Sequence, residues 1–264
     1  MKELSFYYML KIRFSSPVKD HRFTLRCVPC NNERQKMKQM EISVLPKENL
    51  SSSTDSFGNY CIYGNCKSPH DLFMAEVRGI AQVGLKDAEY AGEDYRMGRY
   101  RYQTVYTHPG DAIRDFHSRI PSLKGKTNLQ KAVLMMETLY KNFQYVQGVT
   151  TIHTTAEEAM VLGKGVCQDY AHILISLCRM EGIPARYVVG MLIGEGASHA
   201  WVEVYDEPYW IALDPTNMLM VNDQHIKISG GRDYQDCVIN QGIMTGLAQQ
   251  KQEIEVLVEE IREE

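Results

Sequence analysis

The sequence has no long uninterrupted apolar run. No stretch of roughly eighteen apolar residues occurs in its 264 residues, so no transmembrane helix is predicted. The first residues, 1–11, are interrupted by charged side chains and are typical of a strand, not of a signal peptide with its apolar h-region. We therefore expect a cytoplasmic protein with no membrane partner.

An excess of positive charge is also missing. The chain has 29 Lys and Arg residues against 33 Asp and Glu residues, and its formal net charge is −4 at pH 7. This balance provides no electrostatic footprint for nucleic acid or for an anionic membrane surface. The contents of 44% hydrophobic and 23% charged residues are ordinary for a globular protein. We expect no nucleic-acid partner.

Cysteine is sparse and odd in number, with seven residues at positions 27, 30, 61, 66, 167, 178 and 237. In a reducing cytoplasm most of them should be thiols. Cys27 and Cys30, with Cys61 and Cys66, have the residue types of a four-thiolate zinc site. The first pair, however, lies in a strand-like run and not on a knuckle turn, so small buried residues are the favoured interpretation. We expect no metal ion and no cofactor, and the lack of an acidic loop argues against calcium regulation.

Residues 1–107 carry short runs in which apolar and polar residues alternate. Phe6, Tyr8 and Leu10 form one such run, and polar turns such as residues 51–55 separate the runs. Many short strands with polar turns favour a β-sandwich domain over this region.

Helical patterns precede strand patterns in residues 108–264. Apolar residues at helical spacing predict helices over residues 112–120 and 127–141. Thr155 and Glu158 fit a capping box for a further short helix. The predicted strands span residues 185–192, 198–205, 209–213, 224–229 and 253–259. Helices packed on a mostly antiparallel sheet would make this region an α+β domain.

The most informative stretch is residues 165–172, Gly-Val-Cys-Gln-Asp-Tyr-Ala-His. It opens an apolar run, residues 173–180, which ends at Gly182 as a helix does. Gly165 permits a tight turn before that helix, so Cys167 should lie at the helix N-terminus. Unpaired N–H groups and the helix dipole there favour the thiolate, the nucleophilic form of cysteine. Cys167 is therefore the candidate nucleophile, and a buried structural cysteine is the plain alternative.

Two later stretches supply a base and a carboxylate. His199 begins the strand pattern of residues 199–204, and Asp214 ends the next strand pattern, 209–214. A hairpin between these strands would bring His199 close to Asp214. A cysteine nucleophile, a histidine base and a carboxylate that orients the histidine make a thiol acyl-transfer triad. A packing histidine and an ordinary Asp-Pro turn are the plain alternatives.

Four short motifs occur in a recognisable order. They are Gly-x-Cys-x-Asp-x-Ala around Cys167, Gly-Ile-Pro-Ala-Arg at 182–186, His-Ala-Trp-x-Glu-Val at 199–204 and Asp-Pro-Thr at 214–216. Together they resemble the core of the transglutaminase-like superfamily. The turn at residues 55–59 and the strand after it resemble the N-terminal β-domain of bacterial transglutaminase-like proteins. The resemblance implies a papain-like core in which the cysteine, histidine and aspartate of these motifs are catalytic.

The oxyanion of a tetrahedral intermediate needs aimed hydrogen-bond donors. The backbone N–H of Cys167 is one candidate, and Gln144 and Tyr145, upstream of the helix, are both candidates for the second. Asp169 is expected to compensate the helix dipole. His225 is not in metal-ligand spacing with any cysteine or carboxylate of the sequence, and we assign it no metal.

These residues predict a reaction on a peptide or protein amide substrate. The thiolate of Cys167 attacks the amide carbonyl, His199 protonates the leaving amine, and a second nucleophile resolves the acyl-enzyme. If that nucleophile is water, the protein is a cysteine peptidase or amidase; if it is a lysine-type amine, the protein is a transglutaminase. We favour hydrolysis, because nothing in the sequence indicates an amine site. A catalytically silent peptide-binding scaffold is the remaining alternative, which the presence of all three triad residues disfavours.

Overall fold

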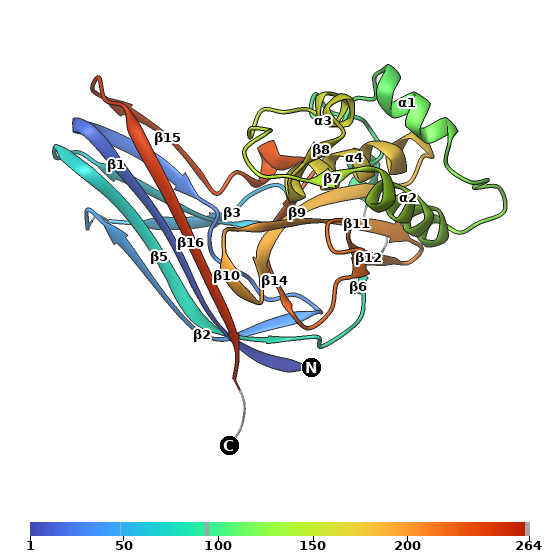
Figure 1. Ribbon diagram of the computed structural model, residues 1–264. Coiled ribbons are helices and arrows are strands. Elements are labelled where there is room, and N and C mark those ends of the chain that lie inside the picture. The colour runs from blue at the N-terminus through green and yellow to red at the C-terminus, as the bar shows by residue number, and fades with distance from the viewer. Residues whose placement is uncertain (48, 93–94, 262–264) are drawn as a thin grey trace.

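The computed structural model describes residues 1–47, 49–92 and 95–261. Figure 1 shows a long curved sheet on one side of the molecule and helices packed over a second sheet on the other. This architecture confirms the predicted α+β class. No helix in the described ranges has the length and apolar character needed to cross a membrane.

The first sheet is organised around one very long strand, β1 (Lys2–Leu25). One of its edges pairs with β4 (Tyr60–Cys66) and then β5 (His70–Val83), and the other pairs with β15 (Asn240–Thr245) and then β16 (Gln250–Glu260). All four pairings are antiparallel. The register with β5 shifts between Arg13 and Val18, and Figure 1 shows β1 and β5 bending at this end of the sheet.

The bend brings aromatic side chains from the two halves of the sheet into contact. Phe23 lies beyond the register shift on β1, Phe73 of β5 pairs with Ile12 on the other side of that shift, and the two ring centroids are 4.7 Å apart. The ring centroid of His21 also lies 4.9 Å from that of Phe73. The two halves therefore share an aromatic core. The outer strands are β2 (Gln35–Leu45), beside β5, and β3 (Ser51–Thr54), beside β4.

Strand pairings connect segments on the two sides of residue 107. β16, from the C-terminal end of the chain, pairs with β1, and β10 (Gly194–Gly196) pairs with β16. In the opposite direction, β6 (Glu89–Tyr90) pairs with β12 of the second sheet. A domain limit at residue 107 stays a prediction. In the structure, β1 takes backbone partners from both ends of the chain, and β6 joins the second sheet.

The second sheet is antiparallel and has the strand order β13-β12-β11-β9-β14, with β6 beside β12. Its strands match the predicted ones to within two residues at each end, apart from β6 and β13, which the sequence pattern missed. They are β9 (Ala185–Leu192), β11 (His199–Asp206), β12 (Tyr209–Asp214), β13 (Leu219–Met220) and β14 (His225–Gly231).

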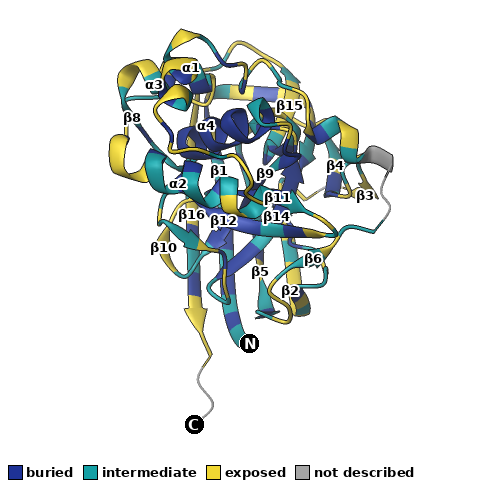
Figure 2. Ribbon diagram, turned by 90° about the vertical axis from the view of Figure 1, so that its right-hand side faces the viewer, coloured by how far each residue is buried: buried dark blue, intermediate teal, exposed yellow. Residues whose placement is uncertain are grey.

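Four α-helices of the described chain cover this sheet, and α4 is the innermost of them (Figure 2). Every residue of α4 from Gln168 to Arg179 is buried. Arg179 satisfies its buried guanidinium by donating to the carbonyl oxygens of Tyr100, Ala185 and Arg232 and to Oγ1 of Thr107. The helices are α1 (Asp111–Ser118), α2 (Asn128–Asn142), α3 (Ala156–Leu162) and α4 (Cys167–Met180), and the short 3₁₀ turns are η1 (Tyr95–Tyr100) and η2 (Tyr234–Cys237).

Local capping starts these helices where the sequence indicates. Thr127 and Thr155 both form capping boxes, the second with Glu158 as predicted. The N-terminus of α1 has no cap of its own and is capped by Glu157 of α3, whose carboxylate accepts from the backbone N–H groups of Gly110, Ala112 and Ile113. The helical layer is therefore held together at helix ends as well as by its apolar core.

The four cysteines considered for zinc do not gather into a metal site. Cys61 and Cys66 are buried in β4, Cys27 is buried just after the end of β1, and Cys30 is partly buried. Within the described ranges, three potential metal ligands do lie close together, but they are His199, Asp214 and His225 of the candidate active site.

Candidate active site

Cys167 is the first residue of α4, as the sequence predicts. The preceding residue, Val166, is extended, and its backbone N–H donates to Oδ2 of Asp169 at 2.7 Å. A Cβ atom on Gly165 would lie 2.4 Å from the same oxygen, so the chain can make this approach only with glycine. The turn that positions the thiol is therefore specified by Gly165 together with Asp169.

Asp169 does more than compensate the helix dipole, which was its expected role. It is 1% exposed, and its Oδ2 also accepts from Oγ1 of Thr150 at 2.7 Å. Burial raises the pKa of Asp169, and the hydrogen bonds from Val166 and Thr150 oppose that rise. The neighbouring Gln168 donates to the carbonyl oxygen of Ile152. The first turn of α4 thus anchors the loop around residue 150 beside the thiol.

The hairpin of β11 and β12 brings together the two other predicted residues. His199 begins β11 and Asp214 ends β12, so antiparallel pairing places them at the same end of the hairpin. His199 Nε2 lies 2.7 Å from Asp214 Oδ2. The side chain of Cys167 also interacts with His199, and because Nε2 faces the carboxylate, Nδ1 is the ring nitrogen left for sulfur. The three predicted residues therefore form one connected chain.

The hydrogen bonds and charges around His199 favour the protonated form of its imidazole. Burial lowers the pKa of His199, but hydrogen bonds to Asp214 and Cys167 outweigh burial and raise the pKa to about 10. Burial raises the pKa of Asp214, but hydrogen bonds from His199 and His225 outweigh it and hold this pKa well below its usual range. A neutral His199 next to Cys167 can take the thiol proton, and its raised pKa favours the imidazolium that forms beside the sulfur nucleophile.

Asp214 accepts more hydrogen bonds than the sequence indicates. Its Oδ1 accepts from the backbone N–H groups of Thr216 and Asn217, at 3.0 and 3.2 Å. Its Oδ2 accepts from Nδ2 of Asn217 at 2.8 Å, and Nε2 of His225 lies 3.3 Å away. The side chain of Asp214 is fully buried, and that of His199 is 11% exposed. The carboxylate is therefore held in one orientation by several donors.

The contact of His225 with Asp214 was not predicted from the sequence, because only the spacing of this histidine from possible metal ligands was considered there. His225 begins β14, which pairs with β9, and β9 pairs in turn with β11. His225 lies near Asp214 because of this strand order and register. Neither the order nor the register can be predicted from a local sequence pattern.

The side chains of His199, Asp214 and His225 are also types that bind metal ions, and their ligand atoms lie within 4.8 Å of one another. Both nitrogen-to-oxygen separations, 2.7 and 3.3 Å, are lengths at which hydrogen bonds form. The group is therefore best described as a hydrogen-bonded cluster.

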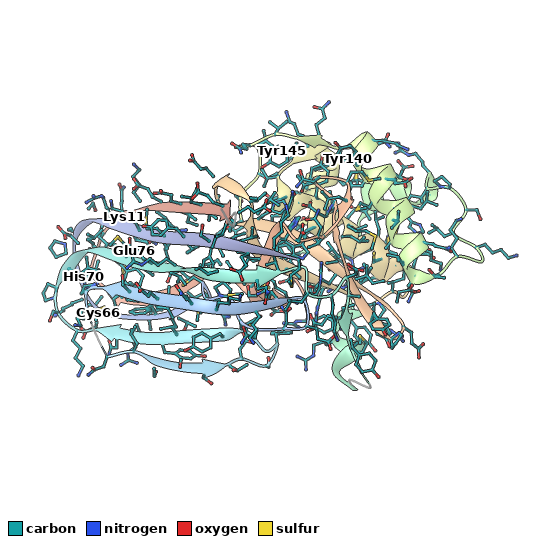
Figure 3. All side chains as sticks on the ribbon, turned by 90° about the horizontal axis from the view of Figure 1, so that it is seen from below. Lys11, Cys66, His70, Glu76, Tyr140 and Tyr145 are labelled. Atoms are coloured by element: carbon teal, nitrogen blue, oxygen red, sulfur yellow. The ribbon has the colours of Figure 1, made fainter. Side chains whose placement is uncertain are left out.

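The candidate oxyanion donors lie close to the turn before Cys167. Gln144 and Tyr145 form β7, which pairs in parallel with β8 (Lys164–Gly165). Both side chains are exposed, and Figure 3 shows Tyr145 on the helical side of the molecule, far from His70 in the long sheet. The N–H of Cys167 lies in the first turn of α4, where helix N–H groups lack intrahelical acceptors. The assignment of the second donor to Gln144 or Tyr145 stays a prediction.

A thiol at a helix N-terminus, joined to an imidazole and a carboxylate on a neighbouring hairpin, places the molecule in the class of transglutaminase-like α+β proteins. Residues 118–215 match the transglutaminase-like superfamily, and residues 5–82 match the bacterial transglutaminase-like N-terminal region. The chain belongs to the transglutaminase-like superfamily.

Similar proteins extend over nearly the whole chain. An uncharacterized protein of Mycobacterium tuberculosis is 30% identical over 250 residues, which cover 82% of this chain and 79% of that protein. One of Mycobacterium leprae is 25% identical over 253 residues, with 88% and 90% covered. The crystal structure of a proposed cysteine protease from Cytophaga hutchinsonii has the same fold, with a TM-score of 0.82 at 20% identity, and covers 100% of this chain and 92% of its own.

Proposed function

We propose that this protein is a thiol-dependent acyl-transfer enzyme that hydrolyses amide bonds in peptide or protein substrates. The observation that carries the proposal is the connected chain of Cys167, His199 and Asp214 at the N-terminus of α4. Cys167 is partly exposed, whereas Asp214 is fully buried. A substrate carbonyl can therefore reach the sulfur while the groups behind it stay out of water.

The reaction has two halves. In the first, the thiolate of Cys167 attacks the amide carbonyl, and the C–N bond breaks as the imidazolium of His199 gives its proton to the departing amine. This leaves a thioester on Cys167 and a neutral imidazole. In the second half, His199 takes a proton from water, the hydroxyl oxygen attacks the thioester, and the carboxylic acid leaves as the thiolate is restored. Asp214 orients His199 throughout and stabilises the imidazolium.

The first experiment is the pH profile of iodoacetamide alkylation at Cys167, measured by peptide mass spectrometry in the parent and in His199→Ala. We expect fast alkylation at low pH in the parent and a slower or shifted profile in the variant. Cys30 is an internal control in the same digest, because it is partly buried and burial raises its pKa. Slow alkylation of Cys167 in both proteins, resembling that of Cys30, would favour the silent peptide-binding scaffold.

Amide hydrolysis provides the second experiment. A panel of peptide amides is incubated with the parent, with Cys167→Ala and with Asp214→Asn, and the products are identified by mass. We expect hydrolysis by the parent only, and full activity of Cys167→Ala would refute the proposal. Replacing the aspartate should lower kcat strongly, by about 10⁴-fold if it acts as the triad aspartate of serine proteases does.

Membership of the transglutaminase-like superfamily is the observation that favours a second acceptor. The same thioester can be resolved by a lysine-type amine, which would form a new amide instead of an acid. Incubation with a glutamine peptide and an excess of a primary amine distinguishes the two, because the products differ in mass. We expect the acid to predominate, and a dominant amine adduct would make transamidation the function.

A further inference from the structure

We propose that His225 is a positioning residue of this centre: as a neutral imidazole it donates Nε2–H to Oδ2 of Asp214 and holds the carboxylate toward His199. The role in catalysis rests on the proposed function, whereas the protonation state and the hydrogen bond do not. No local sequence motif marks His225 for this role.

Three strands carry the two histidines to one carboxylate. His225 pairs with Leu192 at one end of β9, and His199 pairs with Gly190 of the same strand. β14 and β11 therefore flank β9, and Asp214 reaches the cluster from β12, beyond β11. The ring centroids of His199 and His225 are 6.0 Å apart. Asp214 Oδ2 lies between them, 2.7 Å from Nε2 of His199 and 3.3 Å from Nε2 of His225.

The surroundings of His225 decide which nitrogen carries its proton. A lone pair on Nε2 would face the ionised carboxylate of Asp214, so Nε2 must carry hydrogen. The side chain of His225 is 1% exposed. Burial lowers its pKa, the charges of His199 and Arg34 lower it further, and the bond to Asp214 opposes them. The ring is therefore neutral, with its lone pair on Nδ1.

His225 also borders a small polar cavity. His225 and Trp201 both line this cavity, which has a volume of about 20 Å³ and also borders Arg34, Glu203 and Lys227. Nδ1 of His225 and Nε1 of Trp201 are both buried without a protein hydrogen-bond partner. The indole N–H is a donor and Nδ1 of the proposed tautomer is an acceptor, and a cavity of this size holds one water that can bridge them. The cavity thus suits the tautomer that the carboxylate requires.

Packing fixes the orientation of the His225 ring. The ring of Trp201 meets it edge-on, with centroids 5.4 Å apart and an interplanar angle of 78°. Trp201 itself lies over Gly190, where a Cβ atom would be 2.2 Å from the indole. This tryptophan is therefore packed against the ring of His225 and limits its movement. A rigid donor at His225 would keep the carboxylate of Asp214 facing His199 while the charge of His199 changes during the reaction.

Two substitutions separate positioning from packing. His225→Gln keeps an amide N–H that can replace the donor at Nε2, and His225→Leu removes the donor but keeps apolar bulk. For a peptide amide, we expect kcat to fall about 10- to 100-fold in His225→Leu with KM nearly unchanged, the loss that corresponds to one hydrogen bond to a charged group. His225→Gln should recover most of kcat. Equal losses in both variants would indicate packing alone, and an unchanged kcat in His225→Leu would overturn the proposal.

Imidazole ¹⁵N NMR tests the proposal without any activity. In the full-length protein, we expect His225 to be neutral and protonated at Nε2 between pH 7 and pH 8, because its pKa is lowered from the ordinary value of 6.5, and the signal is assigned by its loss in His225→Gln. A cationic ring or a proton at Nδ1 would overturn the proposal. If the tautomer is as proposed but the parent hydrolyses no amide, only the proposed function fails. Zinc that copurifies with the parent and is lost in His225→Leu would make His225 a metal ligand and also overturn the proposal.

Discussion

Gly165 and Asp169 lie so close together that a Cβ atom on the glycine would be 2.4 Å from Oδ2 of the aspartate. That oxygen cannot move freely, because it accepts from Val166 N–H and from Thr150 Oγ1. The turn before Cys167 therefore depends on the absence of a side chain at residue 165.

We expect Gly165→Ala to destabilise the protein by about 1–3 kcal/mol, the usual cost of overpacking, and to slow alkylation of Cys167. Urea unfolding and the alkylation assay measure the two effects. Gly98→Ala is the matched control, since a Cβ atom at Gly98 meets no atom within 4 Å. Equal effects of the two substitutions would contradict this account of the turn.

Stability should depend on pH through His199. Its pKa is about 10 in the folded protein and about 6.5 in an unfolded chain. Because the folded pKa is the higher one, its contribution is fully present below pH 6.5 and is lost as the pH rises toward 10.

The measurement is urea unfolding of the parent and His199→Gln at pH 6, 8 and 9.5. We expect the difference in their free energies of unfolding to shrink by up to about 4 kcal/mol over this range. Asp214 gives the opposite dependence: its folded pKa is depressed, so its contribution is present at neutral pH and is lost on acidification below its ordinary value of 3.8. A parent-to-variant difference that stays constant from pH 6 to 9.5 would rule out the raised pKa of His199.

A second charged cluster holds the sheet behind the candidate active site. Glu203 of β11 is 2% exposed and pairs with Arg186 of β9 and with Lys227 of β14, the latter at 2.8 Å. Arg186 also binds Glu89 of β6 at 3.0 Å, and its guanidinium lies 4.4 Å from the ring centroid of Trp210. The carboxylate of Glu203 therefore joins three strands, and that of Glu89 adds β6 to them.

Glu203→Leu would leave two cations buried beside an apolar side chain. We expect it to lower the free energy of unfolding by about 3–5 kcal/mol in urea denaturation. Glu41→Leu is the control, because Glu41 and Arg78 form an exposed pair, and its effect should be small. A Glu203→Leu protein as stable as the parent would show that the cluster contributes specificity rather than stability.

Glu157 provides a further test, because it caps a helix other than its own. Its carboxylate accepts from Gly110, Ala112 and Ile113 at the start of α1, at 2.8 to 3.1 Å. Glu157→Ala should cost about 1–2 kcal/mol, and hydrogen exchange should accelerate in α1. Amides of α2 serve as the internal control, since Thr127 caps that helix independently. Unchanged exchange in α1 would mean that water replaces the carboxylate at little cost.

Much of the local structure follows from sequence patterns alone. Helical periodicity located α1 and α2 to within a few residues, and the Thr155 capping box is present as predicted. The position of Cys167 at a helix start could be predicted because a glycine turn and an apolar run are local signals. His199 and Asp214 could be placed together because their strands form a short hairpin, whose pairing is set by neighbouring residues.

Contacts between distant segments were decided only by the tertiary structure. The pairing of β16 with β1 joins the two ends of the chain, and the strand pattern of either end permits many other partners. The approach of His225 to Asp214 depends on the register of β14 against β9 and of β9 against β11, where a shift of one residue would turn the ring to the other face. The sequence by itself thus determined the helices, the hairpin and three residues of the centre, because these depend on interactions between near neighbours. The burial of Asp169, the second histidine on Asp214 and the course of the long sheet depend on packing across the whole molecule.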